Sequence, residues 1–437
     1  MLMTVGHKFQ KEEQIMKIRT AMKRFLAVAL AGVMVLSLAA CGAKEEPADD
    51  ASGEGVTLKF QQWWGVELPE GYLQDIVDRY KEETGVTVEL ISAPWADTKT
   101  AITAGATNGT IADIISVDGA WLAEFVDMGI LADAGAAGIN EELAADVWKV
   151  NGTSYVVPVN NFAYPMYVNT DILAAAGVEV PTTWSELIDA CKKITDAGYS
   201  AFALNLGTTN ANGIQNVFGG TGWASGITLK DESGAYAVAG NEDLKALAEL
   251  FKTLYDDGSL YPGMATLEES EMTSNFAAGN CAFTLASAAT MSQFTDVNFE
   301  AVTVPVRDGY EGQSGICYAS WAAGISEACE HKEEAAKFLN WLLEGEDGGV
   351  AGGLASTMSA FPNGVKATPD YSAAPAQFQS FYELYKENYV INEYIGLPNA
   401  SAIMTSMTND LVLYLEGDLD VDTMLTNWQT YLDEAGK

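Results

Sequence analysis

Apolar and polar positions follow two different periods between residues 56 and 128. TLKFQQW (57–63) and VTVEL (86–90) have the two-residue period of strands, and IADIISVD (111–118) is a nearly continuous apolar run, as in a buried strand. Between them the pattern predicts helices, one opened by Pro69 and one from Trp95 to Ala106. The order strand, helix, strand, helix, strand indicates βαβ units and a largely parallel sheet.

After residue 150 the pattern changes. NGTSYVVPVNNFAYPMYVNTDIL (151–173) is rich in strand formers, and a helix then starts at Thr183, which forms a capping box with Glu186. Apolar residues three and four apart predict further amphipathic helices over 241–257, from 331 and over 421–437. The pattern therefore predicts an α/β fold.

The first forty residues have the order of a secretory signal. Lys23 and Arg24 precede the apolar run FLAVALAGVMVLSLAA, and small residues precede Cys41. LAAC (38–41) also resembles the bacterial lipobox, in which the cysteine is lipidated and becomes the first mature residue. Residues 41–55 then read as a flexible lipid-anchored tether. An ordinary buried N-terminal helix is the alternative.

Length and charge narrow the class of protein. A chain of 437 residues suits two domains. The net charge is −37; residues 1–40 hold six Lys/Arg and two Glu, or +4, so the remainder carries −41. Such a surface repels phosphate backbones, which excludes nucleic acid as a partner and disfavours an anionic ligand.

The few histidines and scattered cysteines argue against catalysis and metal binding. Beyond the leader the only histidine is His331, at the start of a charged helix, so a zinc site of the HExxH kind or a Ser-His-Asp triad is hard to build. Four cysteines remain after Cys41, without ligand-like spacing, and we expect free thiols. We predict no catalytic residue, no metal and no cofactor.

Several segments, taken in order, resemble one known family. They are the lipobox and acidic tether, LKFQQWWG, IADIISVDGAWLAEFVDMGIL, YVVPVNNFAYPMYVNTDIL, PTTWSEL, FAAGNCAFTL and HKEEAAKFLNWLLEGEDG. Together they resemble the extracellular solute-binding proteins of bacterial ABC importers, and are most similar to the carbohydrate-binding group that includes maltose-binding protein. Two positions depart from the family pattern: Ala112 stands where Pro is frequent, and SAAT (287–290) lacks a tryptophan common in sugar binders.

The resemblance implies a periplasmic-binding-protein-like fold, with two α/β lobes, a ligand cleft between them and three hinge crossings. Lobe one is then 56–165 plus 302–342, and lobe two is 166–301 plus 343–437. The crossings are expected near 164–169, 302–307 and 342–349. Hinge closure around the ligand would follow.

The candidate ligand-binding residues begin with those that follow the predicted parallel strands. Trp63, Trp64 and Asp118 lie at strand ends, where open α/β sheets bind ligands. Adjacent residues of an extended chain point to opposite faces, so we expect one of the two rings to be exposed. The alternatives are that both rings plug lobe one and that Asp118 caps the next helix. Glu67 is a further carboxylate candidate.

Other candidates come from later segments. Asn161 and Tyr164 lie beside the first predicted crossing, and Trp321 falls where the family's chain passes the cleft. The amide- and glycine-rich run 205–226, which ends near Trp223, suits a polar wall with one stacking ring, although it also fits a surface loop. Rings for C–H patches and amides or carboxylates for hydroxyls are what a sugar requires.

The sequence therefore predicts a lipid-anchored bacterial receptor on the extracellular face of the cytoplasmic membrane. This receptor would be a monomer. It would capture a carbohydrate, specifically an oligosaccharide, and deliver it to the permease subunits of an ABC importer. One alternative keeps the fold but binds a polyamine or a peptide. Another is a secreted glycoside hydrolase, which would use a pair of carboxylates.

Overall fold

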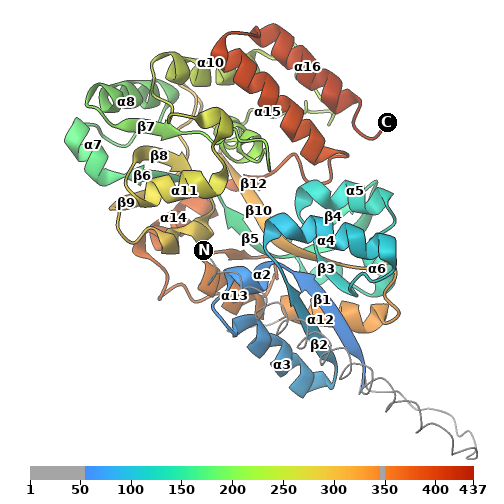
Figure 1. Cartoon of the computed structure of the whole chain (residues 1–437). Coiled ribbons are helices and arrows are strands. Elements are labelled where there is room, and N and C mark those ends of the chain that lie inside the picture. Colours follow the sequence, from blue (N-terminus) through green and yellow to red (C-terminus); the bar gives the residue numbers. More distant parts are fainter. Residues whose placement is uncertain (1–54, 345–349) are drawn as a thin grey trace, which may run out of the picture. The chain divides into compact units, whose positions relative to one another are not determined.

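The protein is described by a computed structural model that covers residues 55–344 and 350–437. The predicted signal peptide (1–40), Cys41, the tether up to residue 54 and residues 345–349 of the third predicted crossing lie outside the described residues. The described residues form a mixed α/β structure with two sheets (Figure 1). We call the part built on each sheet the first half and the second half.

Three parallel strands start the first sheet. β1 (Thr57–Gln62) pairs with β2 (Thr87–Ser92) and β3 (Ile114–Ser116), and α3 (Tyr72–Thr84) and α4 (Trp95–Asn108) connect them (Figure 1). The βαβ prediction for this stretch is confirmed. Its inward residues, such as Leu58 and Phe60, are fully buried, which fixes the register because a shift by one residue would expose them.

The remainder of the first sheet is antiparallel except for one short strand, β12 (Tyr389–Ile391). Its order is β11-β5-β10-β3-β1-β2, where β5 is Thr153–Ala163, β10 is Gly315–Ile325 and β11 is Phe361–Pro362. β4 (Trp148–Val150) pairs with β5, and β12 pairs in parallel with the start of β10. The prediction of a largely parallel sheet is therefore wrong beyond the first three strands, because β10 arrives from a distant segment and runs against both its main neighbours.

The second sheet has the order β7-β8-β6-β9. The strands are β6 (Met166–Asn169), β7 (Ser200–Ala203), β8 (Cys281–Leu285) and β9 (Phe299–Val302). The longer helices of this half are α7 (Thr170–Ala176), α8 (Trp184–Asp196), α10 (Glu242–Asp256), α11 (Glu269–Ala277), α14 (Ala376–Lys386), α15 (Ala400–Glu416) and α16 (Val421–Asp433). The capping box of Thr183 and Glu186 at the start of α8 is present as predicted.

Each sheet has its own hydrophobic core, and the chain passes between the two more than once. It crosses at Tyr164 and Pro165, between β5 and β6, and returns between β9 and β10. α12 (Lys332–Leu343) and α13 (Val350–Met358) pack against the first core, and β11 pairs with β5. The proposed lobe boundaries remain a prediction.

Short helical segments complete the fold. They are α2 (Trp64–Glu67), α5 (Leu122–Asp127), α6 (Ala134–Ala137), α9 (Gly220–Trp223), a π-helix at Ile214–Gly219 and 3₁₀ turns at Gly119–Trp121, Glu141–Leu143, Met264–Thr266 and Ala288–Gln293. Among the described helices none has the length and apolar character needed to cross a membrane. The four cysteines in the described part of the chain are free, as predicted, and all four are buried.

Candidate functional site

Aromatic residues follow each of the three parallel strands of the first sheet. Trp63 and Trp64 come after β1, Trp95 opens α4 after β2, and Trp121 lies in the turn after β3. Because parallel strands end at the same edge of a sheet, these rings and Asp118 converge there. This edge is the candidate site.

The two adjacent tryptophans are both buried, with 3% and 0% of their surface exposed. The prediction that one of them is exposed is wrong for this structure, because the chain turns into α2 at Trp64 instead of continuing as a strand. Trp63 packs on Trp121, with ring centroids 5.7 Å apart. Trp64 stacks on Trp321, with centroids 5.5 Å apart and ring planes at 11°.

The ring that keeps an exposed face at this edge is Trp95. It is half-buried and stacks on Trp121, with centroids 5.5 Å apart and ring planes at 27°. Its Nε1 donates a hydrogen bond of 3.1 Å to Asp118 Oδ2, so the indole is held from both sides. A rigid ring of this kind can stack on the apolar face of a ligand.

Asp118 takes the capping role that the sequence offered as the alternative, and it also orients Trp95. Its Oδ1 caps the following turn by accepting from the Ala120 amide at 2.9 Å, while Oδ2 accepts from Trp95. Burial raises the pKa of its carboxyl, and these two hydrogen bonds and Lys99 oppose the rise. Lys99 itself forms a 2.6 Å ion pair with Glu124.

Glu67 ends α2 and reaches the ring of Trp321. Trp321 Nε1 donates to Glu67 Oε2 at 2.9 Å. Glu67 keeps an exposed part of its surface, yet desolvation by the surrounding protein raises the pKa of its carboxyl to about 7, against the effect of this hydrogen bond. The negative charge of Glu269, from the second half, adds to the rise.

Glu269 opens α11 and holds the corresponding place on the second half. Asn212 Nδ2 and the Tyr164 hydroxyl both donate to its carboxylate. Burial raises its pKa to about 7, with a further contribution from the charge of Asp118. A carboxyl in such surroundings is on the border of ionisation at neutral pH.

Tyr164 is the electrostatic centre of this group. It is 7% exposed and lies where the chain passes between the two sheets. Its pKa is raised well above its usual value, first by burial and then by the negative charges of Glu269, Asp118 and Glu67 and by Cys317. One hydroxyl thus interacts with carboxylates from both halves.

Asn212 is held in place by a close approach of the backbone. A side chain at Gly213 would put its Cβ 1.6 Å from the Asn205 carbonyl oxygen, so only glycine fits there. Asn205 Nδ2 donates to Asn212 Oδ1 at 3.0 Å, which turns the Asn212 amide so that its Nδ2 can reach Glu269. The run 205–226 therefore does supply one amide to the carboxylates.

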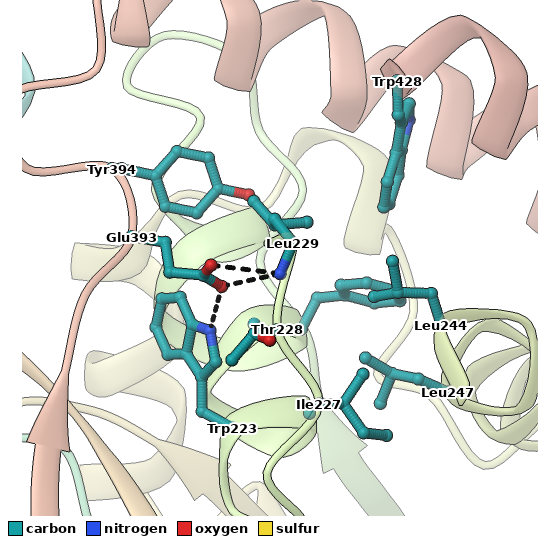
Figure 2. A pocket seen from close by; sticks show the side chains of 12 residues that line it. Trp223, Ile227, Thr228, Leu229, Leu244, Leu247, Glu393, Tyr394 and Trp428 are labelled. Atoms are coloured by element: carbon teal, nitrogen blue, oxygen red, sulfur yellow. Dashed lines mark hydrogen bonds between the residues drawn. The ribbon is translucent and has the colours of Figure 1, made fainter. Parts of the chain in front are cut away.

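Asn161 and Trp223 have other partners. Ser320 Oγ donates to Asn161 Oδ1 at 2.5 Å, between neighbouring strands β10 and β5. Trp223 is 2% exposed, and its Nε1 donates to Glu393 Oε2 at 2.8 Å (Figure 2). The cavity beside it has a volume of about 10 Å³, room for one water molecule at most and far too small for a sugar.

The structure thus brings together six of the eight predicted ligand-binding residues, namely Trp63, Trp64, Glu67, Asp118, Tyr164 and Trp321. Sequence reasoning missed Trp95, Trp121 and Glu269, and it proposed Asn212 only as part of the run 205–226. The strand-end argument applied to Asp118 would also have found Trp95, which follows β2. No local signal separates Glu269 from its acidic neighbours in LEESEM.

The arrangement suits recognition of polar groups more than metal binding. Within residues 55–344 and 350–437, no three His, Cys, Asp or Glu side chains are grouped to hold a metal ion. The carboxylates can accept hydrogen bonds from a ligand, Asn212 and Tyr164 orient one of them, and Trp95 supplies an apolar face.

Comparison with known proteins gives consistent results. The chain is 25% identical over 325 residues to the galactooligosaccharide-binding protein of Bacillus subtilis (strain 168), covering 71% of this chain and 75% of that protein. It is 26% identical over 298 residues to the sn-glycerol-3-phosphate-binding periplasmic protein of Rhizobium meliloti (strain 1021), covering 63% and 66%.

The fold also matches solved structures. The cyclic alpha-maltosyl-1,6-maltose binding protein of Arthrobacter globiformis superimposes with a TM-score of 0.68 at 19% identity, covering 87% of this chain and 98% of that one. This likeness shows the two-lobed α/β fold of the periplasmic binding proteins. The sequence profile of the bacterial extracellular solute-binding proteins matches residues 66–347, well over half of the chain, and the protein therefore belongs to that family.

Proposed function

We propose that the protein captures a carbohydrate, an oligosaccharide, between its two halves and delivers it to the permease of an ABC importer. The observation that carries the proposal is the site itself: Glu67 and Asp118 from the first half interact electrostatically with Glu269 from the second, and the half-buried ring of Trp95 is hydrogen-bonded to Asp118. Two relatives named above are described by the sugars they bind, which supports the same class of ligand.

Sugar chemistry explains why these residue types belong together. Each hydroxyl donates a hydrogen bond, and ionised carboxylates accept without donating, so they suit hydroxyl donors. The C–H face of a pyranose packs on an indole, and Trp95 offers such a face while Asp118 fixes its orientation. Asn212 and Tyr164 hold Glu269 so that its remaining lone pairs can turn toward a ligand.

A solute that carries an amine is the second candidate, and it includes the polyamine alternative. The three carboxylates interact with one another, and the cation beside them, Lys99, already pairs with Glu124. An ammonium group between Glu67 and Glu269 would relieve their repulsion. For the same reason the site disfavours a phosphorylated solute, although one relative is named for sn-glycerol-3-phosphate.

A glycoside hydrolase is the remaining alternative, since it would need a pair of carboxyl groups, one with a raised pKa to act as general acid and one ionised. Glu67 and Glu269 both have a raised pKa. The relatives named above are binding proteins, which supports a role without catalysis.

We further propose that the protein is a monomer held at the extracellular face of the cytoplasmic membrane by a lipid on Cys41. The signal-like residues 1–40 and the lipobox carry this part of the proposal. Cys41→Ser should release the protein into the medium, whereas the parent should stay with the membrane fraction. Equal amounts of both in the medium would contradict the anchor.

The decisive experiment is a thermal unfolding screen of the soluble chain from Gly42 to Lys437. Mono- and oligosaccharides are compared with polyamines, short peptides and glycerol 3-phosphate. A solute at about 100 times its Kd adds roughly 2.7 kcal/mol of stability, enough to measure. The proposal expects a rise with an oligosaccharide that is recovered intact. A rise with a polyamine alone would establish the second candidate, and recovery of cleaved sugar would make the protein an enzyme.

A further inference from the structure

A short segment between β12 and α15, residues 392–397, contacts both halves of the protein. Tyr394 and Leu397 are buried in the second core, whereas Ile395, between them, packs against the first core. We call this segment the strap.

On the second half, the strap is fastened by a carboxylate. Glu393 accepts hydrogen bonds from Trp223 Nε1 at 2.8 Å and from the Leu229 amide at 2.9 and 3.1 Å (Figure 2). Asn392 also ties the strap to the first sheet, because its Nδ2 donates a hydrogen bond of 2.9 Å to the Tyr318 carbonyl oxygen on β10. Hydrogen bonds to a charged group are stronger than neutral ones, so Glu393 is an effective fastening.

On the first half, the strap meets the turn that follows β3. The Gly396 amide donates to the Gly119 carbonyl oxygen at 3.1 Å. A Cβ at Gly119 would lie 2.6 Å from Ile395 Cγ1, so the Ile395 side chain occupies the space left by the missing side chain of Gly119. Gly119 and Ile395 therefore bring two segments into close contact that lie 276 positions apart in the chain.

The turn held in this way carries part of the candidate site. Gly119 directly follows Asp118 and opens the 3₁₀ turn that ends at Trp121. Asp118 orients Trp95, and Trp121 is the ring on which Trp95 and Trp63 pack. A displacement of this turn would therefore move both the carboxylate and the aromatic platform.

We propose that the strap positions the Asp118 turn, with Ile395 as the positioning residue and Glu393 as its fastening to the second half. The strap couples the first half of the site to the second without contacting the solute. The inference rests on the proposed function only in that Asp118 belongs to the binding site; the coupling itself is a property of the protein without solute.

The test is amide hydrogen exchange of the full chain, purified in mild detergent, with no solute added. Four variants are compared with the parent: Ile395→Ala, Gly119→Ala, the double variant Gly119→Ala/Ile395→Ala, and Glu393→Gln. Ile188→Ala is the matched control, because Ile188 is also half-buried but packs against the second core on α8.

We expect exchange in residues 118–127 to become about tenfold faster in Ile395→Ala, Gly119→Ala and Glu393→Gln, as their local opening becomes easier. Ile188→Ala should leave these residues unchanged. In the double variant the new methyl group at position 119 fills the space vacated by Ile395, so exchange should return toward the parent rate. This rescue separates positioning from a general loss of stability.

Two results would overturn the proposal. Unchanged exchange in residues 118–127 of Glu393→Gln would show that the strap does not couple the halves. A double variant that exchanges as fast as Gly119→Ala would show that backbone changes at position 119, not contact with Ile395, control the turn. Since no saccharide is used, either result is independent of whether the protein binds sugar.

Discussion

Replacement of Glu269 by glutamine should change how the stability of the protein depends on pH. The glutamine keeps an oxygen that can accept from both Asn212 and Tyr164, so the hydrogen bonds of the carboxylate have replacements. What is removed is the charge. The variant therefore isolates the free-energy cost of ionising this buried carboxyl.

The size and sign of the effect follow from the pKa. Burial and Asp118 raise the pKa of Glu269 from its usual 4.5 to about 7, which corresponds to about 3 kcal/mol of extra free energy to ionise it in the folded protein. The folded state then binds the proton more tightly than the unfolded state, so stability falls as pH rises from about 4.5 to about 7 and is constant above that. Glu269→Gln lacks this fall.

The assay is thermal unfolding without solute at a series of pH values from 4 to 8.5. At pH 8 the Glu269→Gln variant should be more stable than the parent by up to about 3 kcal/mol, or about 4 to 7 °C in Tm, and the difference should vanish near pH 4. The pKa of Glu67 should also fall in the variant, because Glu269 contributes to its rise. Glu232→Gln, in an exposed loop, is the control; it leaves Glu269 in place and should show the same pH dependence as the parent.

A difference in Tm that stays constant between pH 4 and pH 8 would contradict this prediction, since it would mean that Glu269 titrates alike in the folded and unfolded states. A variant less stable at every pH would show that the hydrogen bonds matter more than the charge.

Three further predictions follow from the structure. Trp95→Ala should raise the Kd of the saccharide found in the screen about tenfold, the effect of losing one stacking ring; calorimetric titration measures it, and an unchanged Kd would exclude Trp95 from the site. Thr183→Ala removes the cap of α8 and should cost about 1 kcal/mol of stability without changing that Kd, and unchanged denaturant unfolding would contradict it. The soluble chain from Gly42 keeps four thiols, all of them buried, and burial raises the pKa of Cys191 and Cys317. A thiol reagent at pH 8 should therefore label the four cysteines only after urea is added. Rapid labelling of the folded protein would be the contrary result.

The parts of the fold that were predicted correctly depend on neighbours in the sequence. The βαβ order of residues 57–116 and the capping box at Thr183 arise from periodicity and spacing within a few residues. The direction of β10 was not predictable in this way, because its partners β3 and β5 lie more than 150 residues away. Register and direction across such a separation depend on tertiary packing.

In the site, too, the residues set by local sequence were predictable, whereas those set by distant contacts were not. Asp118 could be found because the end of a buried strand fixes its position. Trp63 and Trp64 were assigned to opposite faces on the assumption that the strand continues, whereas α2 starts at Trp64 and turns both rings inward. Glu269 lies about 150 residues beyond Asp118, and nothing near it in the sequence indicates that α11 faces that carboxylate.

The charge distribution of the site also bears on how the protein works. The first half contributes Glu67 and Asp118 and the second contributes Glu269. Desolvation raises the pKa of all three carboxyls, and like charges across the halves add to the rise at two of them: Glu269 acts on Glu67, and Asp118 acts on Glu269. A solute that bridges the halves offsets this repulsion through the hydrogen bonds it donates or the positive charge it carries. Without a solute the same repulsion favours separation. Like charges in the site would thus make the closed arrangement depend on the solute, and such dependence lets a permease distinguish a loaded receptor from an empty one.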